Sequence, residues 1–515
     1  MGKTKLIAYD LGTGGIKASL FDEKGGSLAE AFQQYDTFFP NDKFAEQRPE
    51  DWWKCVCLVT RRLLEESGSL PEEIACAALS GHSLAAVPID KDGNLLSRQV
   101  PIWCDMRATD QIPVFFKDLP YKSWYETTGN GDPAETYTIL KLMWMRKYQP
   151  EIFRKIYKIM GSKDFINYKL TDAICTDPSY ASGFGVFNLQ SWDYEDRFFD
   201  AAEISKEIFP AIRPSDEIIG HVTAGAAVQC GLCEGTLVAC GAVDNTCMAL
   251  GTCGLNEGMI YTSLGSSSWI AVTSQKPVID VKTRPFVFAH AKKGFYTSAV
   301  SVFSAGNSFR WIRDTLLKDH ARDTMTYDIM NQMAASVPPG SNGVLFNPSL
   351  SGGSAQEPSP HLCGGFMGLT LGNTREDLVR ASMEGVAMAL RKTLDILRSQ
   401  IDIQGDMLLC GGGSKSAVWR RIFADIYNMP VRKTNIDQDA AALGAAALAA
   451  NACGMWDGYG LIPALHQTEE YLLPDAKTNA YYEKLLDIYG EWTCSLAILG
   501  DKMASLSYPK SGLIS

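Results

Sequence analysis

The stretch Asp10-Leu11-Gly12-Thr13-Gly14-Gly15 combines residue types that bind phosphate groups. Its glycines leave backbone N–H groups open to phosphate oxygens, and the hydroxyl of Thr13 adds a donor. Asp10 ends an apolar segment, which suits a water-mediated contact with Mg²⁺, an ion that keeps most of its waters and takes one or two carboxylates. The stretch predicts a phosphate loop; the alternative is a simple glycine-rich hairpin.

Two further small-residue turns lie in the second half of the chain. Leu264-Gly265-Ser266-Ser267-Ser268 offers N–H groups and hydroxyls without a carboxylate, and is otherwise a surface turn. Cys410-Gly411-Gly412-Gly413-Ser414-Lys415-Ser416 lets a flat group such as adenine lie on bare backbone, or is a tight strand-to-helix connection. Familiar nucleotide motifs fail, because Ser414 precedes Lys415 in place of the Walker glycine, and Lys17 replaces the third glycine of a dinucleotide fingerprint.

A carboxylate is also expected at the end of the apolar segment 237–243. Asp244 follows that segment directly and is itself followed by Asn245 and small residues. This placement suits a carboxylate presented to a cleft, and the alternative is a helix N-cap.

Hydrophobic periodicity predicts the elements that position these residues. Strands are expected on both sides of the first two turns, at 6–10, 16–21, 259–264 and 269–273. This repeated pattern predicts two related lobes with a boundary near residue 252. Further strands are expected at 27–33, 74–79, 237–243 and 407–410, and helices at 51–66, 139–148, 151–160, 375–400, 415–428 (with Ser414 as N-cap) and 439–451.

Composition excludes several classes of protein. The 515 residues are 46% hydrophobic and 21% charged, as in folded proteins, and the net charge of −11 disfavours nucleic acid or an anionic membrane as partner. No run of about 18 apolar residues predicts a membrane span. The fourteen cysteines are scattered, which predicts a reduced, cytoplasmic enzyme. Cys230 and Cys233 form one pair without the second pair of a zinc site, so we expect no metal there.

Taken in order, these motifs resemble those of the FGGY family of carbohydrate kinases. The resemblance covers roughly residues 5 to 450, and ordered motifs are unlikely to coincide by chance. Its carriers are DLGTGGIKASLFD, TILKLMWMRKYQPEIF, GAVDNTCMALG, SLGSSSW, GGFMGLTLGNTREDLVRASMEG, LCGGGSKSAVWRRIFADIYNMPV and DQDAAALGAAALAA. Thr136 and Tyr148 depart from the edges of the first-half signature.

The resemblance implies an α/β fold of two ribonuclease-H-like lobes, as in the actin/hexokinase/Hsp70 superfamily, with a cleft between them. It implies a sugar-binding lobe at 1–252 and a nucleotide-binding lobe at 253–515, transfer of the ATP γ-phosphoryl group to a primary hydroxyl, and Mg²⁺. A homodimer is common among such relatives. Carried over, the roles are base for Asp244, metal for Asp10, phosphate contact for Gly12, Thr13, Gly14, Lys17, Gly265, Ser266, Ser267 and Arg310, and adenosine contact for Gly412, Gly413 and Ser416.

The sugar is less closely defined. By the same resemblance the residues that would contact it are His82, Ser83, Trp103, Asp105, Asp244 and Asn245. The alternatives are a satisfied core histidine, a core tryptophan and, for Asp105, a surface Asp–Arg pair. Family members acting on xylulose carry Met-His-Gly where this chain has Ser83-Leu84-Ala85, and glycerol kinases carry an Arg-Glu pair that is missing here. D-xylulose is the leading candidate. Ribulose, a tetritol, a sugar acid or a deoxy-ketose remain alternatives, as does a non-catalytic ATP-binding module, against which the presence of a base argues.

Overall fold

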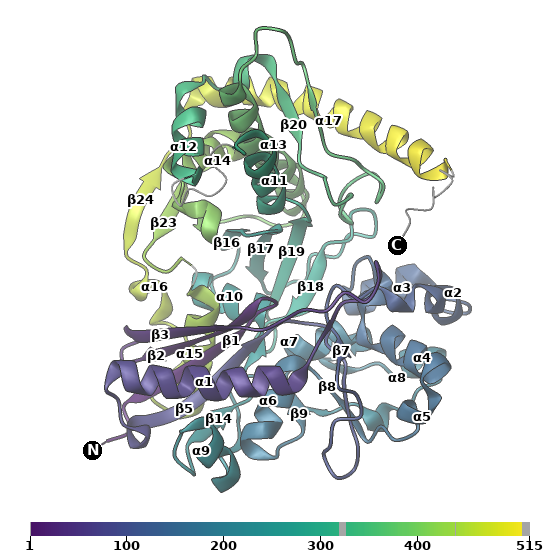
Figure 1. Cartoon of the computed structure of the whole chain (residues 1–515), viewed down its shortest axis with the longest axis vertical. Coiled ribbons are helices and arrows are strands. Elements are labelled where there is room, and N and C mark those ends of the chain that lie inside the picture. Colours follow the sequence, from purple (N-terminus) through teal and green to yellow (C-terminus); the bar gives the residue numbers. More distant parts are fainter. Residues whose placement is uncertain (1, 319–325, 438, 507–515) are drawn as a thin grey trace. The chain divides into compact units, whose positions relative to one another are not determined.

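The computed structural model describes residues 2–318, 326–437 and 439–506 (Figure 1). The chain forms two compact units, each assembled from three segments. Unit 1 contains Met1–Glu257, Thr273–Ser298 and Asp439–Gln467, and unit 2 contains Gly258–Val272, Ala299–Gln438 and Thr468–Ser515. The chain first leaves unit 1 after Glu257, near the expected boundary at residue 252, and returns to it twice.

Unit 1 is built on a mixed sheet with the strand order β13-β14-β5-β1-β2-β3, in which β15 also pairs with β5. β1 runs antiparallel to β2 but parallel to β5, and β15 is also parallel to β5. The carboxyl ends of β1, β5 and β15 therefore meet at one edge of the sheet. The bounds are β1 Lys5–Leu11, β2 Gly15–Phe21, β3 Ser27–Gln34, β5 Ile74–Gly81, β13 Ile218–His221, β14 Leu237–Ala239 and β15 Ala242–Val243.

Helices cover both faces of this sheet. α1 (Pro49–Ser67) buries Trp52, Val56 and Val59, spaced three and four residues apart, and packs on β2 and β3 (Figure 1). On the other face α15 (Ala440–Ala452) packs on β1 and β5, and α10 (Asp244–Cys253) packs on α15. The two helices approach closely because Gly444 has no side chain: a Cβ there would lie 1.9 Å from the Cys247 carbonyl oxygen.

Smaller elements complete unit 1, and most of them lie in the segments between β5 and β14. Four short strand pairs, β4–β7, β6–β8, β9–β12 and β10–β11, connect these segments. The bounds are β4 Glu46–Gln47, β6 Val87–Ile89, β7 Val100–Pro101, β8 Lys158–Met160, β9 Cys175–Thr176, β10 Phe187–Asn188, β11 Asp193–Tyr194, β12 Ala211–Ile212, β18 Phe286–Ala289, α2 Ile112–Phe115, α3 Tyr121–Thr128, α4 Thr138–Tyr148, α5 Pro150–Phe153, α6 Ser162–Thr171, α7 Pro178–Ala181, α8 Asp196–Ala202, α9 Ala224–Cys230 and α16 Ile462–Leu465.

Unit 2 repeats the arrangement of a hairpin beside a parallel strand. Its strands follow the order β19-β17-β16-β22-β23-β24, with β16 antiparallel to β17 and parallel to β22. The long helix α13 packs on α11, α12 and α14. The bounds are β16 Ile260–Leu264, β17 Ser268–Ser274, β19 Tyr296–Val302, β20 Leu345–Asn347, β21 Gly365–Met367, β22 Met407–Cys410, β23 Val431–Thr434, β24 Thr468–Leu472, α11 Gly306–Leu316, α12 Thr326–Ser336, α13 Arg375–Arg398, α14 Ala417–Tyr427 and α17 Ala476–Ser505.

Three local expectations need correction. Segment 151–160 is not one helix: α5 ends at Phe153, and Lys158–Met160 is a strand, because it pairs with β6. Segment 237–243 is two strands, separated at Gly241, whose φ of 73° breaks the extended conformation. The helix expected at 415–428 begins at Ala417 with Ser416 as its N-cap, not Ser414.

Cys230 and Cys233 are free thiols, the first buried and the second half-buried. Burial raises the pKa of Cys230, which makes its thiolate less accessible as a ligand or nucleophile. Within the described ranges, none of the helices has the length and apolar character needed to cross a bilayer.

Candidate active site

The predicted residues of unit 1 gather at the edge where β1, β5 and β15 end. In register, Leu11 lies beside Gly81, and Gly81 beside Val243. Asp244 and His82 each follow one of these strands directly. Neighbouring strands are about 4.8 Å apart, so groups at the three ends lie within about 10 Å of one another. The fold thus brings Asp10, His82 and Asp244 together although they are far apart in sequence.

Asp10 is a half-buried carboxylate at the end of β1. The hydroxyl of Ser80, its partner on β5, donates to Asp10 Oδ1 over 2.7 Å. Burial raises the pKa of Asp10, while the Ser80 hydrogen bond and the charge of Lys17 act in the opposite direction. Ser80 fixes one carboxylate oxygen and leaves capacity for a further ligand, which fits a water-mediated Mg²⁺ contact.

Asp244 is the first residue of α10, and its Oδ1 accepts a 2.7 Å hydrogen bond from the Asn245 backbone N–H. It is half-buried. Burial raises its pKa to about 7, with the nearby charge of Asp10 adding to the effect, whereas the Asn245 hydrogen bond opposes it. A carboxylate with a pKa near neutrality can both accept and release a proton at physiological pH.

Side chains of unit 1 hold the loop Gly12–Gly14 through hydrogen bonds to its carbonyl groups. Tyr35 Oη donates to the Gly12 carbonyl oxygen, and Gln47 Nε2 donates to the Thr13 carbonyl oxygen over 2.7 Å. Gly14 is exposed, and a Cβ there would meet nothing within 4 Å. The loop is held at its carbonyls and open at its tip, as a loop that presents N–H groups to a phosphate must be.

Trp103 connects the predicted sugar residues to this loop. Its side chain is 39% exposed, and its Nε1–H donates to Thr13 Oγ1 over 2.9 Å. An aromatic ring predicted to pack against a sugar therefore lies beside a hydroxyl predicted to contact a phosphate. This proximity is what transfer of a phosphoryl group to a sugar hydroxyl requires.

Lys17 has ion-pair partners within unit 1. Its ammonium group forms an ion pair with Glu30 at 2.9 Å and another with Asp439. Two carboxylates therefore neutralise it within unit 1. These ion pairs help to hold the fold of unit 1 together. The predicted contact between Lys17 and a phosphate stays a prediction.

His82 is 1% exposed and packs edge-on against Trp52, with ring centroids 5.3 Å apart. Neither of its ring nitrogens has a protein partner in hydrogen-bonding geometry, which is uncommon for buried polar atoms. Burial lowers its pKa to about 4, so the imidazole is neutral and carries one donor and one acceptor. Ser83, next to it, is half-buried. Sugar hydroxyls would satisfy such a ring.

Asp105 has no exposed surface. Its oxygens accept from the Ala45 N–H at 2.8 Å, from the Arg107 N–H at 3.1 Å, and from Arg107 Nε and Nη2 at 2.8 Å each. Arg107 also pairs with Glu46 at 2.6 Å. These bonds occupy the carboxylate, so its surroundings differ from those expected of a group that contacts sugar directly.

In unit 2, Gly265, Ser266 and Ser267 form the turn between β16 and β17, and the first two are exposed. The N-terminus of α11 lies against this turn: the Gly306 N–H donates to the Gly265 carbonyl at 3.1 Å, and the Asn307 N–H to the Ser266 carbonyl at 2.9 Å. Arg310, exposed on α11, donates to Ser266 Oγ at 3.3 Å. A helix N-terminus, an arginine and hydroxyls together favour an anion.

The third motif lies beside this turn in unit 2. Gly411 has a φ of 86°, and a Cβ at Gly413 would lie 2.9 Å from Leu264 Cβ. Gly412 is exposed, as a bare surface for a flat base must be. The hydroxyl of Ser416 instead donates to Asn331 Oδ1 at 2.6 Å and accepts from the Trp419 N–H at 3.1 Å, so its visible task is capping α14.

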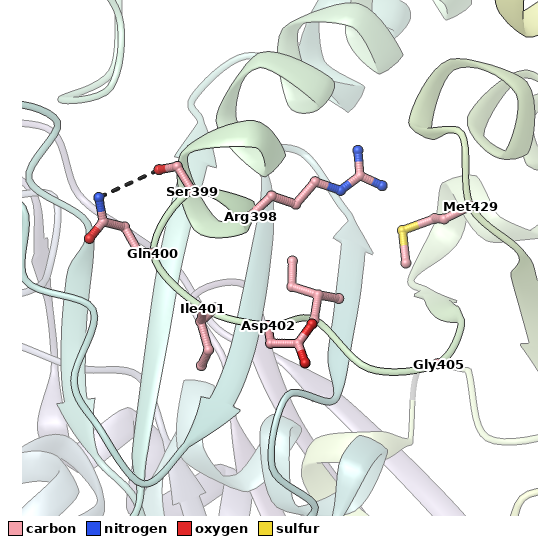
Figure 2. Close-up of a pocket in the computed structure, with 8 residues that line it drawn as sticks. Arg398, Ser399, Gln400, Ile401, Asp402, Gly405 and Met429 are labelled. Carbon is pink, nitrogen blue, oxygen red and sulfur yellow. Dashed lines mark hydrogen bonds between the residues drawn. The ribbon is translucent and has the colours of Figure 1, made fainter.

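A separate cavity of about 610 Å³ opens in unit 2 (Figure 2). It is lined by residues 398–403 with Gly405 and Met429, at the end of α13. Gly405 precedes β22, whereas Gly412 follows it. Since β22 is parallel to β16, this cavity lies at the opposite end of the strands from the Gly265 and Gly412 loops. It is not the predicted nucleotide site.

Several supporting residues were missed in the sequence. Ser80, Tyr35 and Gln47 hold Asp10 and its loop, yet polar residues of these types carry no local pattern. Lys141 did carry a signal, because it is a lone charge in the apolar run Ile139–Met143. It is fully buried.

Comparison with known proteins agrees with this geometry. Residues 6–251 match the N-terminal domain of the FGGY family of carbohydrate kinases, and residues 260–453 match its C-terminal domain. The xylulose kinase of Lactococcus lactis is 28% identical over 94% of this chain and 96% of its own, and the gluconokinase of Bacillus subtilis is 28% identical over 94% of each. The structure of a ligand-bound xylulose kinase from Lactobacillus acidophilus has a TM-score of 0.89 at 26% identity, covering 97% of this chain and 99% of that one.

The chain belongs to the FGGY family of carbohydrate kinases. It is therefore a sugar kinase, and kinases of this family use ATP as a substrate. The predicted family and the two-sheet α/β fold are confirmed.

Proposed function

We propose that the protein transfers the γ-phosphoryl group of ATP to a primary hydroxyl of a small neutral sugar, with D-xylulose as the leading substrate. The observation that carries the proposal is Asp244, a carboxylate with a pKa of about 7 at the strand edge that also holds Asp10 and His82. The hydrogen bond from Trp103 to Thr13 supports the proposal, because it joins a ring predicted to pack on the sugar to the predicted phosphate loop.

In this mechanism Asp244 accepts the hydroxyl proton while the sugar oxygen bonds to the γ-phosphorus and ADP departs. The N–H groups of the exposed residues Gly14 and Ser266 and the guanidinium of Arg310 would bind phosphate oxygens, whereas the Gly265 N–H already donates to the Ser267 carbonyl. Gly412 and Gly413 would lie under the adenosine. Asp10 would hold Mg²⁺ through water, and the ion would offset phosphate charge.

For Asp105 we propose a positioning task in place of the direct sugar contact first expected. Its carboxylate joins the Trp103 segment to Ala45 and Arg107. His82, with its unpartnered neutral ring, is the better candidate for a sugar ligand. Ser83 and Asn245 adjoin His82 and Asp244, and their predicted sugar contacts stay predictions.

The charges of unit 1 favour a neutral sugar over a sugar acid. A carboxylate substrate needs a cation, yet Lys17 pairs with Glu30 and Asp439, and Arg107 pairs with Asp105 and Glu46. Lys163 is buried between Asp164 and Asp177. Gluconate is nevertheless the second candidate, because a gluconokinase is as similar to this chain as a xylulose kinase is.

The test is ADP release measured against D-xylulose, D- and L-ribulose, L-xylulose, erythritol, glycerol, gluconate and L-fuculose, with Mg²⁺ and without sugar. We expect one neutral ketopentose to give kcat/KM above about 10⁴ M⁻¹s⁻¹. For that sugar, kcat/KM should fall as the pH drops through about 7, because Asp244 becomes protonated. A strong preference for gluconate would overturn the neutral-sugar proposal and leave the kinase assignment intact. A cytoplasmic location and a homodimer stay predictions.

A further inference from the structure

Lys141 lies on α4 with no exposed surface, and its ammonium group donates two hydrogen bonds to backbone carbonyls. One acceptor is the Leu84 carbonyl oxygen at 2.8 Å, and the other is the Ile102 carbonyl oxygen at 2.7 Å. These carbonyls belong to the two loops on which sequence reasoning placed sugar contacts. One loop carries His82 and Ser83, and the other carries Trp103.

The first loop needs an external restraint. Leu84 has a φ of 62°, a left-handed conformation that is unfavourable for a bulky residue without special support. The Leu84 side chain packs against Gly183, where a Cβ would lie 2.8 Å from Leu84 Cδ2. The Lys141 hydrogen bond to the Leu84 carbonyl fixes the peptide group that carries this strain, two residues after His82.

The second loop is fixed at the residue before Trp103. The Ile102 N–H donates to the Ala45 carbonyl at 3.1 Å, while its own carbonyl accepts from Lys141. Trp103 in turn donates to Thr13 Oγ1. A displacement of Ile102 would therefore move the exposed indole ring and its contact with the phosphate loop.

Apolar packing alone does not account for a lysine at this position. Its neighbours Ile139, Leu140 and Leu142 are apolar and fully buried, and a methionine would fill similar volume. Burial lowers the pKa of Lys141 to about 7, against the favourable charges of Asp105 and Cys104. Burying this amine costs free energy, and the hydrogen bonds that it donates to the two loops offset that cost.

We propose that Lys141 is a positioning residue that holds the His82 and Trp103 loops in one arrangement, and that this arrangement sets the affinity for the sugar. The inference rests on the proposed function only for the identity of the sugar. The restraint that Lys141 places on the two loops does not depend on which sugar binds.

The matched pair of variants is Lys141→Met and Lys147→Met. Both lie on α4, but Lys147 is exposed and pairs with Asp110 on the surface. In the absence of ligand, Lys141→Met should speed amide hydrogen exchange at least fivefold in residues 82–86 and in residues 102–107, and Lys147→Met should change neither segment.

Steady-state kinetics supply the second measurement. Lys141→Met should raise KM for the sugar at least tenfold while KM for ATP stays within twofold, and Lys147→Met should change neither. A lower melting temperature with unchanged exchange in both loops and unchanged sugar KM would show a merely structural role and overturn the proposal. So would faster exchange in one loop only.

A second variant and the exchange measurement cover the cases in which Lys141→Met does not fold or no sugar is phosphorylated. If Lys141→Met does not fold, Lys141→Gln, which keeps a shorter donor, is judged by the same criteria. If no sugar in the panel is phosphorylated, the proposed substrate fails while the exchange of the two loops still decides the role of Lys141.

Discussion

The hairpin loops of the two units share one geometry but differ in charge. In unit 1, Asp10 pairs in parallel with Ser80 on β5, and His82 begins the loop that follows β5. In unit 2, Ser263 has the position of Asp10: it pairs in parallel with Cys410 on β22, and that strand leads to Gly412. One arrangement thus presents carboxylates and a histidine in unit 1, and neutral donors and bare glycines in unit 2.

The supports of the two loops differ as well. Side chains of Tyr35, Gln47 and Trp103 hold the Gly12–Gly14 loop, whereas backbone N–H groups at the start of α11 hold the Gly265–Ser267 loop. From this comparison we predict that unit 1 carries the proton chemistry, and that the neutral donors of unit 2 serve in anion binding. Four substitutions test this division, and a fifth prediction concerns stability; they follow in order of expected effect.

Asp244→Asn should lower sugar-dependent kcat by about 10³-fold, because the amide cannot accept the hydroxyl proton. The dissociation constant for ATP, measured by calorimetry, should stay within twofold. Asp110→Asn, an exposed carboxylate of the same unit, is the control and should keep wild-type turnover. Near-normal turnover in Asp244→Asn would show that Asp244 is not the base.

Ser263→Asp places in unit 2 the carboxylate that unit 1 has in Asp10. Since Ser263 is 4% exposed and close to the predicted phosphate turn, the added charge should raise KM for ATP by roughly 30-fold through like-charge repulsion. Ser263→Asn, which has nearly the same volume, separates charge from bulk and should change KM far less. Equal effects of both variants would mean that volume, not charge, distinguishes the two hairpins.

Gly306→Ala tests the backbone support of the unit 2 turn. Its Cβ would lie 2.2 Å from the Gly265 carbonyl oxygen, so α11 or the turn must shift. A shift of this size should raise KM for ATP about tenfold and leave the sugar KM unchanged. Gly225→Ala, at a glycine with open space around it, is the control in unit 1. An unchanged ATP KM would show that this turn does not bind the nucleotide.

Arg310→Gln removes the exposed cation beside Ser266. We expect KM for ATP to rise about threefold at low salt and the difference to shrink at high salt, since exposed charges are screened. Arg313→Gln, one turn further along α11, is the control. A salt-independent loss would point to a packing role for Arg310 instead.

The smallest effect concerns stability. Because the folded-state pKa of Asp244 is raised to about 7, the folded protein holds a proton that the unfolded chain releases near pH 4. Its contribution to the free energy of unfolding therefore declines as pH rises from 4 to 7. In urea titrations, the free energy of unfolding of Asp244→Asn should exceed that of wild type at pH 8 and equal it at pH 3.5. Equal stability at pH 8 would contradict a raised pKa.

The sequence determined most of the local structure. Apolar runs around Asp10, Leu264 and Cys410 gave the strands and turns, because strand periodicity and glycine-rich turns are local properties. The segment Lys158–Met160 escaped this reasoning because only pairing with the distant strand β6 makes it a strand. The cap of α14 is Ser416 in place of Ser414, because the turn Gly412–Lys415 precedes the helix and the Ser416 hydroxyl accepts from the Trp419 N–H.

The sequence alone determined the family, the order of the motifs and the residue types able to perform the chemistry. Only the tertiary structure decided which of them share an edge: parallel pairing of β1, β5 and β15 brings Asp10, His82 and Asp244 together. It also decided which groups have partners already, such as Lys17 and Asp105, and that Lys141 donates hydrogen bonds to two loops. The physical reason is that burial and pairing depend on residues distant in sequence, which no local pattern records.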